Sequence, residues 1–522
     1  MKNSRGLYLT IITAVLAIYY LFLGIYLNRL GYANPESLFY IEKAKIVFQG
    51  VGDRIKVMGL TTPIFPFYAT FIFTLISYTL APIIASAIGT AVLFNILATN
   101  LVKRFNDDFY LFILLLLFLF HPGILYSACS GKGMYLVLIF FFLFFLNVLK
   151  FYKSNTTFHI SIASICLVVL VFCDYKFIWL TLFFIPLVLS IAIQSLNLSE
   201  KESIFRLFIS FNSPTLRRKL INKTFALYII IFILPIASIV AFKLLNLTHA
   251  NDLNYFIESP YATWNVLADK INFDQVPVKG VTYFLPEEIS LLITARVLIF
   301  CPLILLGVYM FKDSTYQILT ILTPFAFVEF LHIKYEKTFL VYDYYMIFLI
   351  LALLCIIYKG VMIKNQLLLK IGVGVILIIQ IFTGYIYLRQ SRIVDEQNFI
   401  TILLNHQPDP QQSGNRDAAD YINSLPGTSK VLVDDAVAYP VAAYVNNIQH
   451  LTMPYEDEFA SAIEIPNKFD DYILIATAKN AATGYTQVND KYAIIVKQDN
   501  SRLNLQKIFE NHDWILYRII MR

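Results

Sequence analysis

Long apolar runs constrain the fold of this chain more than any other feature. A helix needs about 20 mostly apolar residues to cross the hydrocarbon core of a bilayer, and about eleven runs approach that length. They lie at roughly 7–28, 83–102, 109–126, 134–150, 158–173, 177–195, 224–245, 289–311, 315–332, 340–358 and 370–388. Only 15% of the 522 residues are charged, well below the roughly 25% of a soluble domain. The sequence therefore predicts an all-α polytopic membrane protein with about 11 transmembrane helices, and it excludes a cytosolic enzyme.

The run at 62–80 either crosses the membrane or lies along its surface, because Pro63, Pro66 and Pro82 bracket it. The loop charges favour the surface position. If the run does not cross, one set of loops holds these basic clusters: Lys2/Arg5, Lys103/Arg104, Lys150/Lys153, Arg217/Arg218/Lys219/Lys223 and Lys359/Lys364/Lys370. The positive-inside rule then places the N-terminus in the cytoplasm and the C-terminus outside. Spanning helices indicate the inner membrane if the source is a bacterium.

Three outer segments follow from this topology: loop 29–82, loop 246–288 and a tail at 390–522. The tail is rich in Asp, Asn, Gln and Lys, which separates it from the apolar body at 1–389. A helical pattern covers Arg416–Leu425, and strand-like runs lie at Lys430–Val433, Tyr472–Ala476 and Tyr492–Val496. This alternation predicts a soluble α/β domain outside the membrane.

Several function classes find no support in the sequence. The net charge of +6 comes from loop lysines and arginines of a membrane protein, so we expect no nucleic-acid partner. No GxxxxGK[ST] or GxGxxG motif is present, so nucleotide use is unsupported. The five cysteines have no metal-ligand spacing, and the residues by themselves imply no cofactor.

The first outer loop contains the most informative segment, Asn34-Pro35-Glu36-Ser37-Leu38-Phe39-Tyr40. Pro35 fits the first turn of a helix, so Glu36 would lie near a helix N-terminus at the membrane surface. Tyr40 and Lys43 follow at i+4 and i+7 and share its face. Glu36 is a candidate general base toward an acceptor hydroxyl or amine. The alternative is that Glu36 only complements the helix dipole.

This layout resembles the GT-C glycosyltransferases. The shared features are a first helix, an outer loop with the pattern Pro35, Glu36 and Tyr40, a Pro-containing surface segment from Thr62, and a spanning helix that ends at Lys103-Arg104. They cover roughly residues 1–360 and are most similar to the protein O-mannosyltransferases and the lipid A aminoarabinose transferase. The tail from 390 is not part of the resemblance.

The resemblance implies sugar transfer on the outer face of the membrane. The donor would be a sugar on a polyprenyl phosphate, the acceptor a glycan, a lipid or a protein, and the anomeric configuration would invert. Glu36 would be the base, with Tyr40 and Lys43 beside it in the substrate pocket. The chain departs from the family at Ser37, where a second acid is common, and at 127–133, which lacks a carboxylate. These departures leave the use of a divalent cation open.

Further candidates lie in other loops. Asp53 is a reserve base, although its glycine-rich setting is also typical of a plain turn. Arg296 lies about two turns inside a predicted span, where a charge is costly. It is a candidate for binding the donor phosphate, and the alternative is an ion pair with Glu329.

The turn from His332 to Lys337 is similar to basic turns near the donor phosphate in the family. His332, Lys334 and Lys337 are therefore candidates for substrate binding, and the lysines for neutralising the leaving phosphate. The alternative is an interfacial belt of the kind that Tyr and Lys form at headgroup depth. Asp174-Tyr175-Lys176 is a charged outer turn that we interpret as a connector.

The sequence thus predicts an integral-membrane glycosyltransferase that contacts membrane lipids and uses a lipid-linked sugar. One alternative is a transporter or flippase of a lipid-linked glycan, which would be expected to show mid-membrane charges and internal repeats. Another is a non-catalytic membrane protein that displays a binding domain, for which about eleven spans are many.

Overall fold

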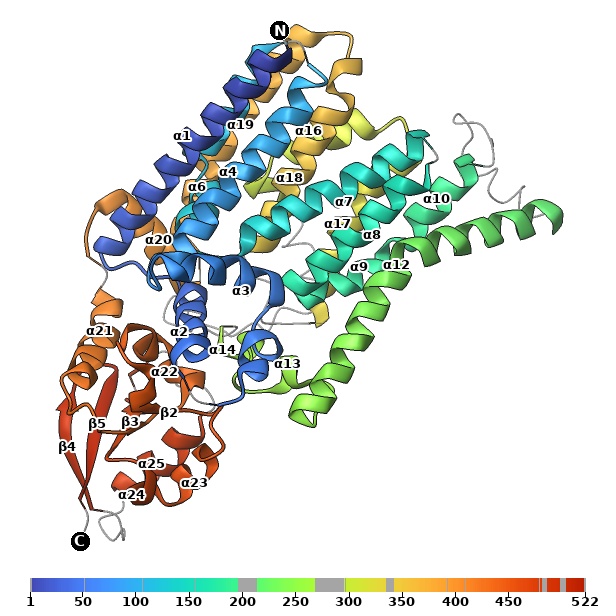
Figure 1. The fold of residues 1–522 in the computed structure, drawn as a ribbon. Helices are drawn as coiled ribbons and strands as arrows, with labels where there is room; N and C mark the ends of the chain where they lie inside the picture. The colour runs from blue at the N-terminus through green and yellow to red at the C-terminus, as the bar shows by residue number, and fades with distance from the viewer. Residues whose placement is uncertain are drawn as a thin grey trace, which may run out of the picture.

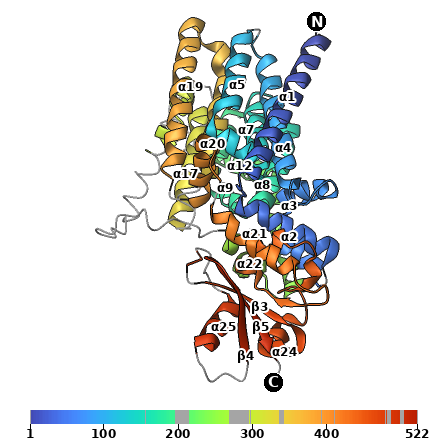
Figure 2. The same cartoon turned by 90° about the vertical axis from the view of Figure 1, so that its left-hand side faces the viewer.

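A bundle of apolar helices stands on a small α/β unit (Figure 1). The computed structural model describes residues 2–50, 52–105, 107–154, 156–195, 214–267, 295, 297–334, 342–391, 393–408, 410–477, 479–480, 486–497 and 504–520. The N-terminus lies at the end of the bundle that is far from the α/β unit, and the C-terminus lies beyond that unit (Figures 1 and 2).

Six helices among the described residues are long and apolar enough to cross a bilayer. They are α1 (Lys2–Arg29), α4 (Ala81–Val102), α7 (Met134–Ser154), α12 (Pro214–Ala250), α18 (Tyr342–Lys359) and α19 (Gln366–Arg389). Their length and composition identify an integral membrane protein.

Two further pairs are bent and add up to two spans. The pair α5 (Asp108–Phe120) and α6 (Pro122–Cys129) bends by 63°, because Pro122 cannot continue the hydrogen bonds of α5. The second pair bends by 45° and joins η3 (Tyr175–Trp179) and α9 (Leu180–Phe183) to α10 (Ile185–Ser195).

The remaining predicted runs form shorter helices: α8 (Thr157–Cys173), α16 (Leu303–Phe311) and α17 (Thr315–Lys334). Every apolar run thus contains helix, although part of 289–311 lies outside the described residues. The count of about eleven spans is not confirmed, because length and composition support six to eight.

The run at 62–80 forms short helices that lie across the bundle. Figures 1 and 2 show α3 roughly at right angles to α4. Its eight residues, Ile64–Phe71, continue into η2 (Ile72–Leu75) and are too few to cross a bilayer core. This geometry supports the surface position that the loop charges favour.

Outer loop 29–82 also contains α2 (Pro35–Gln49) and η1 (Lys56–Leu60). Loop 246–288 contains α13 (Tyr255–Glu258) and α14 (Thr263–Val266), and its part from 268 onward lies outside the described residues. The short η6 (Gly360–Met362) follows α18.

The C-terminal unit is built on a five-stranded sheet with the order β2-β1-β3-β5-β4. The strands are β1 (Val431–Leu432), β2 (Leu451–Thr452), β3 (Tyr472–Ala476), β4 (Asn504–Glu510) and β5 (Trp514–Ile520). β1 runs parallel to β2 and β3, whereas β5 runs antiparallel to β3 and β4. The sheet confirms the expected α/β character of the tail.

Helices cover both faces of this sheet. They are α21 (Pro410–Asn423), α22 (Asp435–Tyr444), η7 (Ile448–His450), α23 (Phe459–Glu464), α24 (Pro466–Phe469) and α25 (Gln487–Lys497). Alternate strand residues point to opposite sides, so Val431 and Leu474 face α22, whereas Leu432 and Ile473 face α23 and α25. The predicted strand Tyr492–Val496 is wrong, because it lies within α25. Val488, Tyr492 and Ile495 recur there at helical spacing and pack on the sheet.

Two elements join the sheet unit to the bundle. α2 shares its hydrophobic core with α22, through residues such as Leu38 and Phe39. α20 (Val394–Asn405) turns back from α19 and buries Phe399 and Ile400 in the core of the bundle. The tail beyond 390 therefore begins with a helix that packs on the membrane-spanning body, and the sheet unit follows it.

Candidate functional site

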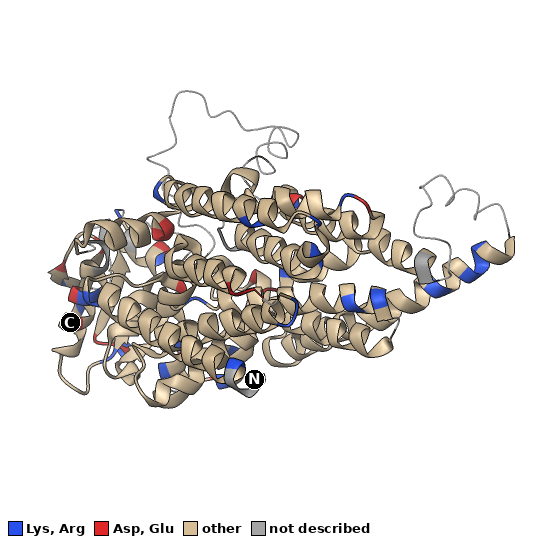
Figure 3. Cartoon of the chain, turned by 90° about the horizontal axis from the view of Figure 1, so that it is seen from above, with Lys and Arg blue, Asp and Glu red and all other residues tan. Residues whose placement is uncertain are grey.

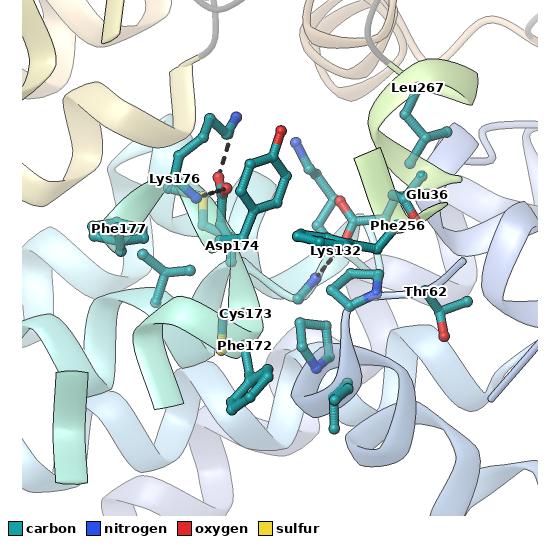
Figure 4. Close-up of a pocket in the computed structure, with 18 of the residues that line it drawn as sticks. Glu36, Thr62, Lys132, Phe172, Cys173, Asp174, Lys176, Phe177, Phe256 and Leu267 are labelled. Carbon is teal, nitrogen blue, oxygen red and sulfur yellow. Dashed lines mark hydrogen bonds and ion pairs between the residues drawn. The ribbon is translucent and has the colours of Figure 1, made fainter. Parts of the chain in front are cut away.

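A cavity of about 300 Å³ lies where the outer helix ends meet the short helices of the loops (Figure 4). Its walls come from the N-terminal ends of α2 and α20, from α3, from the turn after α6, and from the C-terminal end of α8 with η3. α12 and the two short helices of the second large loop close another side. The cavity therefore collects residues from segments that are far apart in sequence.

Glu36 lies in this cavity at the start of α2. Pro35 occupies the first turn, and the Asn34 side chain accepts a hydrogen bond from the Glu36 backbone N–H at 2.9 Å. The Glu36 Oε1 atom accepts hydrogen bonds from the Tyr40 hydroxyl at 2.7 Å and from the Gly133 N–H at 3.2 Å. Glu36 thus lies at the helix N-terminus and also faces the cavity, and its role as a base stays a prediction.

Tyr40 lies one turn further along α2 and donates its hydroxyl hydrogen bond to Glu36. Its side chain is fully buried, and burial together with the neighbouring Glu36 charge raises the pKa of the phenol well above its usual range. Tyr40 therefore remains a hydrogen-bond donor and holds the carboxylate in one orientation. It lies against the site without lining the cavity.

The turn after α6, Ser130–Gly133, brings Lys132 into the cavity beside Glu36 (Figure 4). Gly131 has φ +80°, and a Cβ there would lie 2.2 Å from Ser37 Oγ. The Ser37 hydroxyl in turn donates to the Ser130 carbonyl at 2.7 Å. The turn therefore needs glycine and fits tightly against α2, which fixes the position of Lys132.

Asp174 and Lys176 form the opposite wall of the cavity (Figure 4). Asp174 accepts a hydrogen bond from the Tyr344 hydroxyl and pairs with the Lys176 ammonium at 3.2 Å. Lys176 is buried and lies 4.8 Å from the centre of the Tyr344 ring. This turn is therefore more than the connector that the sequence suggested, because it brings a second carboxylate and a second lysine to the cavity.

Asp395, at the start of α20, completes the polar wall. Its carboxylate accepts hydrogen bonds from Asn34 at 2.6 Å, Tyr126 at 2.5 Å and Tyr32 at 3.2 Å. Burial raises the pKa of Asp395 to about 6, against the opposing effects of these donors and of Lys132. No local pattern singled out Lys132 or Asp395, because Lys132 stands between two glycines of a short turn and Asp395 is one of several polar residues that follow the last apolar run.

Lys43 does not lie in the cavity. Its side chain is fully buried further along α2, where it pairs with Glu42 at 3.0 Å and with Asp435 of α22. Its ammonium also donates to the Tyr455 hydroxyl. The helical face that Lys43 shares with Glu36 does not bring Lys43 into the cavity, since the α/β unit covers that part of the helix.

Asp53 forms a turn, as its glycine-rich setting indicated. Its carboxylate accepts hydrogen bonds from the backbone N–H groups of Ile55 at 3.0 Å and Lys56 at 3.3 Å. It does not line the cavity. Nothing in its position supports the role of a reserve base.

The predicted turn from His332 to Lys337 is described only in part. Lys334 is exposed, and its ammonium lies 3.7 Å from the centre of the Trp179 ring rather than in the cavity. This geometry fits the interfacial belt that was the alternative interpretation. Arg296, Lys337 and the side chain of His332 lie outside the described residues.

The described residues contain no cluster of three or more His, Cys, Asp or Glu side chains that would hold a metal ion. Glu36 and Asp174 face the cavity from opposite walls, and Asp395 and Glu396 also line it. Each of these carboxylates is engaged by hydrogen bonds or an ion pair. The arrangement is therefore suited to proton transfer and to binding an anion between lysines.

Comparison with known structures identifies the architecture. ArnT from Cupriavidus metallidurans, solved with undecaprenyl phosphate bound, is similar over 97% of both chains with a TM-score of 0.50 and 12% sequence identity. The chain has the GT-C fold. The resemblance inferred from the first outer loop is therefore confirmed at the level of fold.

Weaker similarity extends to two structures of the AglB oligosaccharyltransferase from Archaeoglobus fulgidus. The complex with an inhibitory peptide and dolichol phosphate has a TM-score of 0.43 over 91% of this chain and 69% of that one, at 12% identity. The apo form has a TM-score of 0.40 over 88% and 69%, also at 12% identity. The fold assignment rests on ArnT alone. No protein-family model and no curated protein matches the sequence.

Proposed function

We propose that this GT-C protein is an integral-membrane glycosyltransferase that moves a sugar from a polyprenyl-phosphate donor to an acceptor on the outer face of the membrane. The observation that carries the proposal is the cavity in which the Glu36 carboxylate and the Lys132 ammonium lie on one wall and Lys176 on another. A base and two cations around one space are what the displacement of a phosphate by a hydroxyl or an amine requires.

In the proposed reaction Glu36 takes the proton from the acceptor hydroxyl or amine. The acceptor atom attacks the anomeric carbon, the bond between that carbon and the phosphate oxygen breaks, and its electron pair leaves with the phosphate. A single displacement of this kind inverts the anomeric configuration. The hydrogen bonds from Tyr40 and Gly133 to Oε1 hold the carboxylate in place at the cavity.

Lys132 and Lys176 are the proposed contacts of the donor phosphate. They replace Lys334, which stacks on Trp179 away from the cavity. Lys132 approaches from the turn beside Glu36, whereas Lys176 is already held by Asp174. Arg296, His332 and Lys337 stay predictions, and a divalent cation between the carboxylates and the phosphate also stays open.

The apolar side of the cavity suits the lipid part of such a donor. Val171 and Phe172 of α8 line this side together with Ile239 and Phe242 of α12, and the Phe172 and Phe242 rings pack edge-on at 5.6 Å. Both helices belong to the membrane-embedded bundle, so an isoprenoid chain would enter from the bilayer and keep its phosphate at the polar wall. The undecaprenyl phosphate bound to ArnT is a ligand of this class.

The proposed orientation places the cavity and the α/β unit on the outer side, in the inner membrane if the source is a bacterium. The N-terminal end of α1 and the α/β unit lie at opposite ends of the molecule (Figures 1 and 2). Figure 3 shows lysines and arginines along the N-terminal part of α12, where the sequence places Arg217, Arg218, Lys219 and Lys223. The positive-inside rule assigns the N-terminal part of α12 to the cytoplasmic side.

The test is release of polyprenyl phosphate from a panel of polyprenyl-phosphate sugars by purified protein supplied with membrane extract as acceptor. Glu36→Gln should reduce turnover by about 10²- to 10⁴-fold, because loss of a general base costs this much. Its amide oxygen still accepts from Tyr40 and Gly133, so the fold should persist.

Asp53→Asn is the matched control, because it removes a carboxylate from the same loop outside the cavity. We expect near wild-type turnover from this variant. Turnover that is lost in Asp53→Asn and kept in Glu36→Gln would show that the base is assigned wrongly. No consumption of any donor by the wild type would contradict the transferase proposal itself.

A further inference from the structure

Asp395 connects parts of the protein that are distant in sequence. It lies at the start of α20, just after α19, the last helix able to span the membrane among the described residues. Its three hydrogen-bond donors, Tyr32, Asn34 and Tyr126, come from the first outer loop and from α6. Three protein donors around one buried carboxylate make Asp395 an anchor for the groups that surround it.

The Asn34 side chain transmits the effect of Asp395 to Glu36. Its Nδ2 donates to Asp395 at 2.6 Å, while its Oδ1 accepts from the Glu36 N–H at 2.9 Å. A carboxylate can only accept, so Asp395 selects the orientation of the amide in which Oδ1 faces α2. The opposite orientation would place an NH₂ group against the Glu36 N–H and remove the cap of the helix.

A second connection runs through Tyr126 to Lys132. The Tyr126 hydroxyl donates to Asp395 at 2.5 Å, and the Lys132 ammonium lies 5.3 Å from the centre of the Tyr126 ring. The positive charge of Lys132 also favours the ionised form of Asp395, which lowers its pKa against the effect of burial. One carboxylate therefore contacts the supports of both the proposed base and the proposed phosphate ligand.

We propose that Asp395 is a positioning residue of the transfer site, which aims Glu36 through Asn34 and Lys132 through Tyr126. This inference rests on the proposed function for its kinetic consequence and on the contacts of Asn34 for its structural one. It assigns the segment after α19 a part in the site, although that segment contributes no proposed catalytic group.

The test compares Asp395→Asn with the wild type and with Asp470→Asn. Asp470 is a matched control because it is a buried aspartate, it accepts a hydrogen bond from Thr452 at 2.6 Å, and burial raises its pKa to about 6 as well. It lies in the sheet unit and does not line the cavity. Asn at 395 keeps the size of the side chain but turns an NH₂ group toward at least one donor.

Two measurements are made on the full-length purified variants. Hydrogen–deuterium exchange should become about tenfold faster at the first-turn amides of α2 in Asp395→Asn and stay unchanged in Asp470→Asn. In the polyprenyl-phosphate release assay, kcat should fall about 10- to 100-fold in Asp395→Asn, with KM for the donor within about twofold of wild type.

The outcomes separate this inference from the proposed function. If the wild type turns over the donor and folded Asp395→Asn has the same kcat, the positioning role is overturned and the transferase proposal stays intact. If the wild type consumes no donor, the proposed function fails, and the exchange rates alone decide whether Asp395 orders the start of α2. Unchanged exchange there would overturn the inference in either case.

Discussion

Glu42, Lys43 and Asp435 show how the environment of a residue changes its role. In the sequence Lys43 shares a helical face with Glu36 and suggests a substrate contact. In the structure α22 covers Lys43. Its single positive charge is shared by the carboxylates of Glu42 and Asp435, and all three side chains are buried. Burial raises the pKa of Glu42 to about 8, against the lowering effect of Lys43.

The raised pKa of Glu42 makes stability depend on pH. Folding favours the protonated form, so the stabilisation is complete below the ordinary pKa of about 4.5 and is lost as the pH rises through about 8. Glu42→Gln removes this titration and should melt at a higher temperature than the wild type at pH 9. The difference should be on the order of 5 kcal/mol at pH 9 and should shrink to roughly 2 kcal/mol at pH 6. Thermal unfolding of the detergent-solubilised protein at several pH values measures it.

Glu464→Gln provides the comparison for this experiment. Glu464 is 73% exposed and pairs with Lys491 at 3.0 Å on the surface, where one ion pair contributes little. Its substitution should leave the pH dependence of melting as in the wild type. A stability difference for Glu42→Gln that is constant from pH 6 to pH 9 would contradict the assignment of the titration to Glu42.

The turn Ser130–Gly133 and the start of α2 are the elements that form the candidate site. Gly131 has a positive φ, and its Cα lies so close to Ser37 and Pro82 that a Cβ would clash with both. The turn therefore packs tightly on α2. Gly133 then donates its N–H to Glu36, and the neighbouring Lys132 lines the cavity. A change in this turn therefore acts on the proposed base and the proposed phosphate ligand together.

Gly131→Ala should destabilise the protein by about 1–2 kcal/mol, since a side chain is strained at positive φ, and the new methyl group would displace Ser37. We expect a larger proportional loss of turnover than of stability, because the displaced turn releases Glu36. Gly372→Ala is the control, since a Cβ in that part of α19 meets no atom within 4 Å. Equal turnover of the two purified variants would contradict the structural role of the turn.

At the scale of the whole molecule, the α/β unit is attached to the outer end of the bundle through α2. Lys45 of α2 donates to the carbonyls of Ala443 and Val445 at the end of α22, both at 2.7 Å. Phe39 of α2 packs edge-on against Tyr439 of α22. The site and the α/β unit therefore lie at the same end of the bundle, and the proposed orientation places the basic loops on the other side of the membrane.

Cysteine labelling tests this orientation. The five native cysteines are buried, so a membrane-impermeant maleimide should give little background on intact cells. Gly427→Cys, at an open surface position of the α/β unit, should react without permeabilisation. Lys364→Cys, in the exposed loop before α19, should react only after it. The reverse pattern would contradict the positive-inside interpretation.

The sequence by itself determined the class of the protein and one residue of its site. Apolar runs predicted the long helices of the bundle, because a bilayer demands continuous apolar segments. Asn34, Pro35 and Glu36 carry their own capping signal, so local residues are enough to place Glu36 at a helix N-terminus. The tertiary structure alone decided which outer turns meet there, and it brought Lys132, Lys176 and Asp395 to Glu36 while it covered Lys43. Such contacts join segments that are far apart in the sequence and leave no periodicity or spacing in the chain.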